Sequence, residues 1–532
     1  MRSAWFKGAL FGMACVGFAP GCGHDDGATT PPDAGPDALA SDLLDPHVCG
    51  SCHQDHFNQW SGSMHAYASQ DPVFLAMNKR MQRENPSLGT FCVKCHAPMA
   101  VLAGKTTDGL NLPELTSACA STTNPTGCGY LGVTCYFCHS VDSVDTAHEF
   151  NAGVTLASDL VMRGEITDPV PNMAHGAKYS PLHDFHQPES ASLCGACHDI
   201  NSPLGGHIER TFAEWEASPY SGGPDAGPGD ATTCTNSGCH MKQDLNKVIA
   251  VVPALGPLPL RTFFEHDFPA VDQAQKAQTP FPNAPTEQTA IQQKLANSLQ
   301  GALCFTQGAN RISVVLDTVG LGHDFPSGAA QDRRLWTEVI AYDPGGNVLY
   351  QSGVVPDGMS PVDVTNDPDM WLLRDCMFGT DGGLVDMFWQ GQTTDGNELP
   401  PIKSFSASPS TSHRVRLFPK EGGQLTTDGG ALLIPASITL RLRLQPIGID
   451  VLNDLVSTGD LDGGLVAALP PPIDIPLGTD NGTILTWTPS DAADGGILPF
   501  NLGDGLTTCV GTLVGAGSQS AAPPHMNPEC SP

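Results

Sequence analysis

Four short stretches of the chain carry two cysteines separated by two residues, with a histidine directly after the second cysteine. They are CGSCH at 49–53, CVKCH at 92–96, CYFCH at 135–139 and CGACH at 194–198. With 18 cysteines and 18 histidines in 532 residues, about 0.02 such matches are expected by chance. The repeat therefore indicates one chemistry used four times.

The spacing suits covalent attachment of haem. On one helical turn, residues i and i+3 project to the same side, so both thiols can add to the two vinyl groups of one porphyrin. The histidine that follows lies under the ring and can bind the iron. A zinc site needs no histidine after each cysteine pair, and a redox-active disulfide would not recur four times. The predicted haem-binding residues are Cys49, Cys52, Cys92, Cys95, Cys135, Cys138, Cys194 and Cys197, with His53, His96, His139 and His198 on the iron.

A fifth site is less regular. Cys234, Cys239 and His240 form a motif with four residues between the cysteines. The longer loop can bulge while the second cysteine and the histidine stay adjacent. The alternative is a disulfide beside a surface histidine, but the site follows the others at a similar interval, and we favour haem. The predicted cofactor content is about five haem c groups per chain.

Apart from Cys15 and Cys22, which belong to an N-terminal export signal and its predicted lipid site, six other cysteines remain, and in an exported protein an even number predicts three disulfides. They are Cys119, Cys128, Cys304, Cys376, Cys509 and Cys530. The first two flank a short loop that could close on itself. The pairing of the other four is not readable from the sequence.

Haem iron in an electron-transfer site usually takes a second strong ligand. His65 follows Trp60 by five residues, which would give an aromatic wall beside a ligand. His266 and His323 lie in near-copies of one motif, HDFP, whose proline stiffens the loop. His175 precedes the fourth site. We predict these four as distal ligands. The remaining place is open among His148, His183, His186 and His207, and the methionines Met64, Met99 and Met241 are alternatives.

These pieces resemble the tetrahaem cytochrome c-554 family. The matching segments are QWSGSMHA, GVTCYFCHS, SPLH, LCGACHD, ERTFAEWEASPY, CHM and GHDFPSG, which together span about residues 47 to 330. The resemblance implies a haem domain of loops and helices, haems packed edge to edge, and electron transfer. It carries over the attachment residues of the four regular motifs, and the longer motif departs from it. Residues 331–532 are not covered.

The elements that position these residues divide the chain. Residues 1–21 read as a signal peptide, with two basic residues before the apolar run 8–19, and FAPGC resembles a bacterial lipobox with Cys22 lipidated. A Pro/Gly/Asp tether follows at 23–46. The haem domain is predicted at 47–303, with so little protein per haem that the porphyrins themselves would form the core.

After residue 303 the sequence pattern changes, and apolar and polar residues alternate as they do in strands. Strands are predicted at 311–319, 333–343, 347–355, 413–419 and 437–445, and DPGGN at 343–347 is a hairpin turn signal. They favour an antiparallel β-sandwich over 304–500, followed by a loop-rich tail at 501–532. His323 falls in the loop between the first two strands, so we expect it to reach out to a haem and lock the domains together.

The net charge of −31 argues against binding nucleic acid. We expect an exported multihaem cytochrome, lipid-anchored at the outer membrane, that relays electrons between redox proteins whose identity the sequence does not reveal. The alternative is an oxidoreductase in which one five-coordinate haem acts on a small nitrogen or oxygen compound. A third reading gives the β-domain a docking role.

Overall fold

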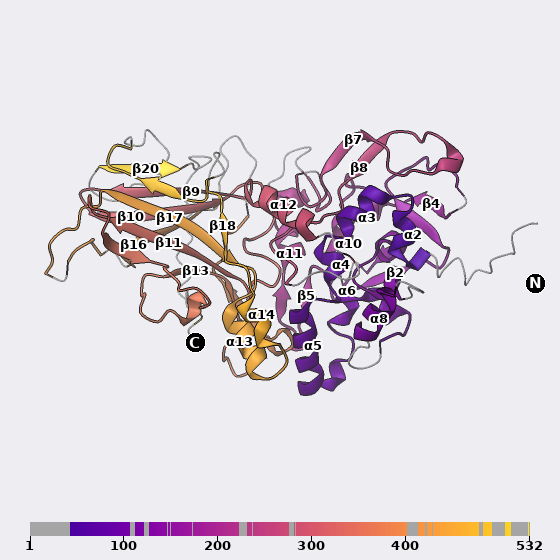
Figure 1. The fold of residues 1–532 in the computed structure, drawn as a ribbon, viewed down its shortest axis with the longest axis horizontal. Helices are drawn as coiled ribbons and strands as arrows, with labels where there is room; N and C mark the ends of the chain where they lie inside the picture. The colour runs from indigo at the N-terminus through magenta and orange to yellow at the C-terminus, as the bar shows by residue number, and fades with distance from the viewer. Residues whose placement is uncertain are drawn as a thin grey trace, which may run out of the picture.

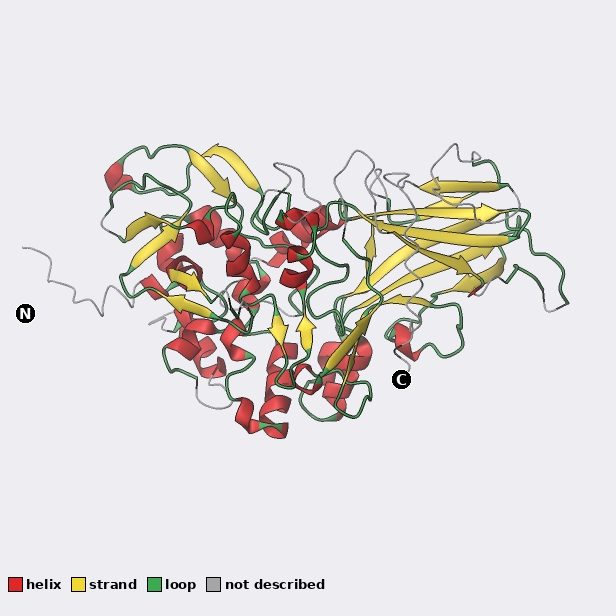
Figure 2. Ribbon diagram, turned by 180° about the vertical axis from the view of Figure 1, so that it is seen from behind, coloured by secondary structure: helices red, strands yellow, loops and turns green. Residues whose placement is uncertain are grey.

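In the computed structural model, short helices, loops and four small two-stranded sheets make up the described residues before about 299, and two larger antiparallel sheets dominate the described residues that follow (Figures 1 and 2). The structure describes residues 43–106, 112–121, 127–145, 147–148, 150–172, 174–222, 231–236, 238–275, 281, 284–401, 413–420, 423–427, 429–477, 482–491, 506–511 and 530. The predicted signal peptide, Cys22, and residues 23–42 of the predicted tether lie outside these ranges. In the part of the chain so described, no helix is both long and apolar enough to cross a bilayer.

The helices of the first part are short, and proline or a capping side chain starts several of them. Asp71 accepts a hydrogen bond from the backbone N–H of Val73 at the start of α5, with Pro72 in the first helical position. Thr134 caps α9 in the same way. The bounds are α2 (Pro46–Gly50), α3 (Gln54–Trp60), α4 (Met64–Tyr67), α5 (Pro72–Glu84), α6 (Val93–His96), α7 (Pro98–Leu102), α8 (Leu112–Cys119), α9 (Cys135–Ser140), α10 (Glu189–Gly195), α11 (Thr211–Glu216) and α12 (Ala284–Leu295).

Each regular cysteine motif starts in a helical turn. Cys49 lies in α2, and α6 runs from the residue after Cys92 to His96 of the second motif. Helix α9 begins at Cys135, and Cys194 lies in α10. The short two-stranded sheets between these helices were not predicted, because their few residues show no clear alternation. They pair β1 (Val141–Val144) with β2 (Val154–Leu156), β3 (Val161–Gly164) with β4 (Gly176–Tyr179), β5 (Ile200–Asn201) with β6 (His207–Glu209), and β7 (Gln243–Lys247) with β8 (Arg261–Phe264).

Two larger antiparallel sheets form the second part. One has the order β16-β10-β9-β20, and the other has β12-β11-β17-β18, with β13 and β19 pairing onto its central strands. Side chains from both sheets, among them Phe305, Val314, Leu335 and Leu440, share one buried apolar core. The bounds are β9 (Leu299–Thr306), β10 (Arg311–Thr318), β11 (Arg334–Tyr342), β12 (Val348–Ser352), β13 (Trp371–Leu373), β14 (Asp375–Phe378), β15 (Thr393–Gly396), β16 (His413–Phe418), β17 (Ser437–Gln445), β18 (Ile473–Ile475), β19 (Leu485–Trp487) and β20 (Thr507–Gly511).

The five predicted strands are confirmed as β10, β11, β12, β16 and β17, and the DPGGN segment turns between β11 and β12. The structure adds elements that the sequence pattern did not indicate. Strand β9 begins at Leu299, ahead of the predicted boundary, and β20 lies within the predicted loop-rich tail. Helices α13 (Ile449–Ser457) and α14 (Gly463–Ala467) follow β17. The strand character of β20 comes from its pairing with β9, which is far away in the sequence.

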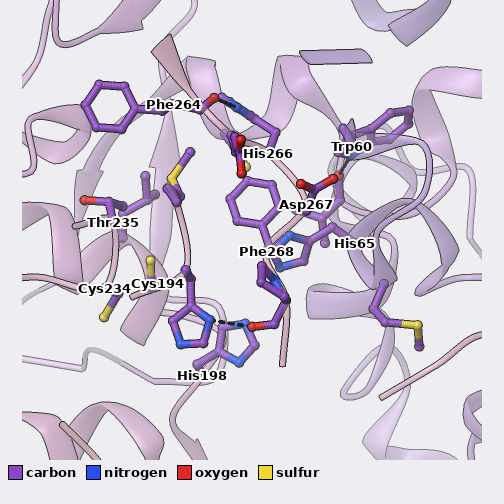
Figure 3. A pocket seen from close by; sticks show the side chains of 18 of the residues that line it. Trp60, His65, Cys194, His198, Cys234, Thr235, Phe264, His266, Asp267 and Phe268 are labelled. Atoms are coloured by element: carbon purple, nitrogen blue, oxygen red, sulfur yellow. Dashed lines mark hydrogen bonds between the residues drawn. The ribbon is translucent and has the colours of Figure 1, made fainter. Parts of the chain in front are cut away.

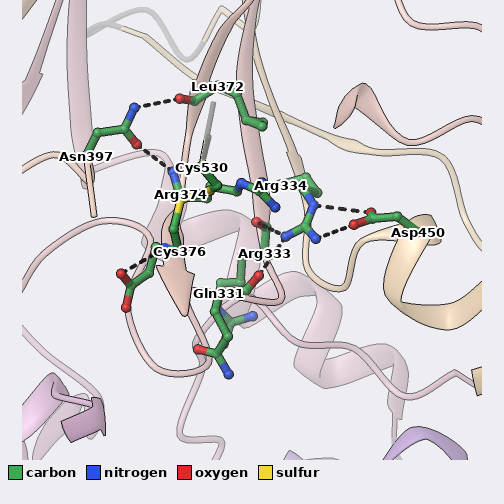
Figure 4. The surroundings of a disulfide bond; sticks show 10 residues. Gln331, Arg333, Arg334, Leu372, Arg374, Cys376, Asn397, Asp450 and Cys530 are labelled. Atoms are coloured by element: carbon green, nitrogen blue, oxygen red, sulfur yellow. Dashed lines mark hydrogen bonds and ion pairs between the residues drawn. A yellow bond between two sulfur atoms is a disulfide. The ribbon is translucent and has the colours of Figure 1, made fainter. Parts of the chain in front are cut away.

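Three disulfides use the six cysteines that lie outside both the haem motifs and the first 22 residues, as predicted. Cys119 pairs with Cys128, Cys304 with Cys509 and Cys376 with Cys530. The second of these bonds ties β9 to β20. The third fixes Cys530 beside β14, near the ion pair between Arg334 and Asp450 (Figure 4).

Ion pairs and apolar side chains join the two parts of the molecule. Arg210, directly before α11, donates to Asp375 (2.7 Å) and lies 3.4 Å from Glu398, and both carboxylates belong to the second part and are buried. Helix α5 packs its buried face against α13, with Met77 and Val451 in one apolar cluster. Figure 1 shows α13 and α14 beside α5 at this boundary.

Replacing Arg210 with methionine is expected to lower the free energy of unfolding of the haem-loaded protein by about 3–5 kcal/mol, because the buried acidic side chains of Asp375 and Glu398 lose their cation. Burial and the charge of Asp375 already raise the pKa of Glu398 to about 8. Denaturant unfolding measures the effect. Arg83→Met is the matched control, since Arg83 also spans the two parts, to Asp460, but its own side chain is exposed and Lys79 also pairs with Asp460, so its loss should cost little. Equal losses in both variants would contradict this account of the interface.

Candidate haem-binding site

One continuous cavity of about 1430 Å³ runs through the first part of the molecule. It exceeds ordinary small-molecule pockets of about 300–1,000 Å³. All ten cysteines of the five motifs line it, and in the structure all ten are free thiols. The nine histidines predicted as iron ligands line it as well, namely His53, His65, His96, His139, His175, His198, His240, His266 and His323. The structure thus brings every predicted haem-binding residue to the same cavity.

The histidine that ends each motif is held by its Nδ1 atom. In four of the five, Nδ1 donates to a backbone carbonyl oxygen, at 2.6–3.0 Å. The acceptors are Ile249 for His53, Ala68 for His96, Arg163 for His139 and Pro269 for His240. In the remaining one, the fourth motif, Nδ1 of His198 donates to the carboxylate of Glu209 at 3.3 Å. With Nδ1 so engaged, the Nε2 lone pair is the one left for a metal.

Four of these five histidines face a second histidine across the cavity. The ring centres of the pairs lie 6.1–6.4 Å apart. The pairs are His53 with His175, His198 with His65, His139 with His266, and His240 with His323. The second member of each pair is one of the four predicted distal ligands, and the structure assigns each to a particular motif.

This ring separation fits an iron between the two imidazoles. A metal–nitrogen bond to histidine is about 2.0–2.1 Å, and the ring centre lies roughly 1 Å behind the nitrogen, so two rings on one metal have centres about 6 Å apart. Direct stacking of two rings would bring them closer, as with His139 and His183 at 5.2 Å. Together with the paired thiols, the spacing shows that these residues fit haem.

Local contacts hold the distal histidines in place. His65 lies in α4, whose first turn Ser63 caps, and its carbonyl accepts the N–H of Val133 (2.9 Å). Nδ1 of His266 donates to Phe264 (2.7 Å), that of His175 to Gly176 (2.9 Å), and that of His323 to Asp324 (2.8 Å). These bonds leave Nε2 directed away from the chain. Figure 3 shows His65, His198 and His266 around the same part of the cavity.

The histidine of the second motif, His96, differs from the other four. The ring of Phe74 stacks on it, with centres 4.0 Å apart and planes 4° from parallel. Among the described residues, no histidine faces His96 as the others are faced. Val73 and Met77 of α5, and Phe388 and Trp389 of the second part, line the cavity and form one apolar cluster with Cys92 of the same motif. This cluster was missed by sequence reasoning, because its residues come from segments more than 300 positions apart.

The other histidines that lie close to the motifs in the sequence have different partners. Nε2 of His183 donates to the carbonyl of Cys138 (2.9 Å), although its ring lines the cavity. His148, His186 and His207 each bond to a carboxylate and do not line the cavity. His56 packs at 4.6 Å from the ring of His266 and 4.1 Å from that of Phe263. None of the five takes the remaining place opposite His96.

Burial keeps three of the facing imidazoles, those of His65, His240 and His266, neutral. It lowers the pKa of His65 to about 3, with His198 adding to the shift, and that of His266 to about 4, with His139 adding to it. Burial and then His323 lower the pKa of His240 to about 4. A neutral imidazole is the form that binds a metal, so these side chains are in the ligating state at neutral pH.

Thiols of different motifs lie next to one another. Cys49 contacts Cys135, Cys95 contacts Cys197, and Cys194 contacts Cys234. Cys194 also lies close enough to Cys138 to contribute electrostatically to the raised pKa of the Cys138 thiol. Figure 3 shows Cys194 and Cys234 side by side. The contacts join the first motif to the third, the third to the fourth, and the fourth to both the second and the fifth.

Comparison with known proteins supports the interpretation of the motifs. Residues 48–140, which contain the first three motifs, match the family of cytochrome c554 and c-prime. The fold is similar to the crystal structure of a penta-heme cytochrome c552 from Thermochromatium tepidum, with a TM-score of 0.51 and 18% identity over 84% of this chain and 98% of that chain. A search of curated proteins gave no match. The predicted resemblance to multihaem c-type cytochromes is thus confirmed.

Proposed function

We propose that this protein relays electrons along about five covalently bound haems, held in the cavity between the ten free thiols and the facing histidines. The observation that carries the proposal is the set of four histidine pairs with ring centres 6.1–6.4 Å apart. Two imidazoles on one iron leave no position for a substrate and change little between oxidation states. Such closed coordination is typical of electron transfer.

When bound, haem supplies a one-electron ferric–ferrous couple. The chain supplies the ligands and their order. From the thiol contacts we infer a row through the first, third, fourth and fifth sites, with the second site branching from the fourth. The row would end at His240 and His323, where the haem domain meets what we propose to be a β-sandwich. Redox proteins at either end are the expected partners.

A reductive titration of the mature protein under anaerobic conditions tests the relay. We expect it to take up about five electrons per chain, with the absorbance of every haem changing as the titration proceeds. Uptake of one or two electrons, with most of the haem absorbance unchanged, would contradict the proposal, because isolated or inert haems cannot relay.

A second candidate function is an oxidoreductase acting on a small nitrogen or oxygen compound. The observation that favours it is the lack of a facing histidine at His96 among the described residues, which would leave one iron with a free position. Carbon monoxide titration of the reduced protein distinguishes the two functions. One molecule bound per chain favours an open second site, and no binding favours a relay in which every iron is closed.

We further propose export and lipid anchoring at the outer membrane. The support is the apolar run 8–19, the lipobox-like FAPGC, and the 20 residues that separate Cys22 from the first described residue, Leu43. Release of a Cys22→Ala protein from the membrane fraction, with all haems attached, is the expected result. Retention of that variant in the membrane fraction would contradict the lipid anchor at Cys22 but not the export of the protein.

A further inference from the structure

Glu209 makes the fourth haem site chemically unlike the others. In the other four motifs the Nδ1 atom of the iron-binding histidine donates to a neutral backbone carbonyl oxygen. In the fourth it donates to a carboxylate, with 3.3 Å between Nδ1 of His198 and Oε1 of Glu209. A carbonyl oxygen offers a dipole, whereas a carboxylate brings a full negative charge to the imidazole.

The fold builds this contact. Strands β5 and β6 form a small antiparallel pair in which Glu209 lies opposite Ile200, two residues after His198. The hairpin thereby returns the carboxylate to the imidazole from eleven positions further along the chain. Glu209 is 9% exposed and lines the cavity, so little water screens its charge.

The charge of Glu209 is not fully cancelled by its surroundings. Arg333 acts on it electrostatically, but the guanidinium of Arg333 is bound to Asp272 through two hydrogen bonds of 2.8 Å.

We propose that Glu209 is a positioning residue that sets the reduction potential of the iron at His198 below that of the iron at the other four sites. A carboxylate that accepts the Nδ1 proton raises the basicity of the imidazole, so Nε2 donates more electron density to iron and favours the ferric state. Since the fourth site adjoins three others, a low potential there would keep the haem at the branch point mostly oxidised and leave electrons on its neighbours.

This inference rests on the proposed attachment of haem at Cys194 and Cys197. The experiment is a spectroelectrochemical titration of the mature protein as wild type, Glu209→Gln and Glu189→Gln. Glutamine keeps the shape and an acceptor oxygen and loses only the charge. Glu189 lies exposed on α10, the helix that carries Cys194, so its variant controls for the loss of a charge that touches no ligand.

In Glu209→Gln we expect the ferric–ferrous equilibrium of the lowest-potential haem to shift about tenfold toward ferrous, which is about 59 mV for one electron. In Glu189→Gln it should not move. Glu209→Asp keeps the charge but places it further from His198, so its lowest potential should lie between those of the wild type and of Glu209→Gln. An unmoved lowest potential in Glu209→Gln with five haems attached, or equal shifts in both glutamine variants, would overturn the proposal.

A measurement on the wild-type protein covers the case in which Glu209→Gln fails to mature. Paramagnetic NMR during stepwise reduction gives the order in which individual haems accept electrons. The haem assigned to Cys194 and Cys197 should be the last to be reduced. Its reduction before the others would overturn the role of Glu209 and leave the relay intact, whereas a mature protein without that haem would overturn both.

Discussion

Replacing His323 with alanine is expected to convert one low-spin haem per chain to high spin while all haems stay attached. The ring of His323 faces that of His240 at 6.2 Å, with planes 16° apart, and its Nδ1 atom is engaged by Asp324. Alanine offers no replacement ligand, so the iron at His240 would become five-coordinate. Electron paramagnetic resonance of the oxidised protein measures the change, and carbon monoxide uptake should rise by one molecule per chain.

His323 has a second role because it is the one predicted ligand that comes from the second part of the chain. It lies in the loop between β10 and β11, which helix α11 of the first part holds through Glu214. That carboxylate accepts the N–H of Asp324 (3.1 Å) and the hydroxyl of Ser327 (2.6 Å). The variant should therefore also lower the temperature at which the two parts separate, as limited proteolysis during heating would measure.

Two further variants sharpen this test. His186→Ala removes a histidine that bonds to Asp184 outside the cavity, and it should change neither spin state nor carbon monoxide uptake. His323→Met offers a weaker ligand and should keep the haem low-spin at a raised potential. Retention of every low-spin signal in His323→Ala would sink the assignment of this residue.

Replacing both Cys234 and Cys239 with serine is expected to lower the haem content from five to four per chain. Serine hydroxyls cannot form the thioether bonds, and axial histidine ligation alone does not retain haem through denaturation. The motif is the irregular one, with four residues between its cysteines, so this variant decides whether the fifth site is real. Haem absorbance per mole of denatured protein gives the count.

The control for this variant removes two cysteines that bind no haem. Cys119→Ser with Cys128→Ser breaks a disulfide that closes a short loop, and all five haems should remain. The variant at the fifth site should still contain the other four, because their thiols belong to other motifs. If the variant without Cys234 and Cys239 still contained five haems, the fifth haem would be attached elsewhere. If the wild-type protein contained only four haems, the fifth site would bind none.

The cysteine motifs are visible in the sequence itself, and it predicted five of the strands and the four facing histidines, because these depend on local spacing, on alternation and on a short repeated motif. It did not indicate which motif each distal histidine faces. That assignment depends on how loops such as the one carrying His323 pack against α11, which no local pattern encodes. The role of Glu209 was hidden for the same reason, since a β-hairpin returns it to His198.

Other features lay beyond sequence reasoning for physical causes of a different kind. The acceptors of four Nδ1 atoms are backbone carbonyls, which every residue has, so residues such as Ile249 and Pro269 carry no signal. Strand β20 exists because β9 pairs with it and the disulfide between Cys304 and Cys509 secures it. The strand pattern of β17, in contrast, was readable, because alternate side chains from Ile438 onward are buried.

The most direct test of the account is a count of covalently bound haem in the purified mature protein. The protein is extracted with acidified organic solvent, which removes non-covalent haem, and the absorbance of the remaining haem is measured per mole of chain. About five haems per chain retained through the extraction is the predicted result. Colourless protein, or pigment that passes into the solvent, would contradict the central claim that the paired thiols hold haem.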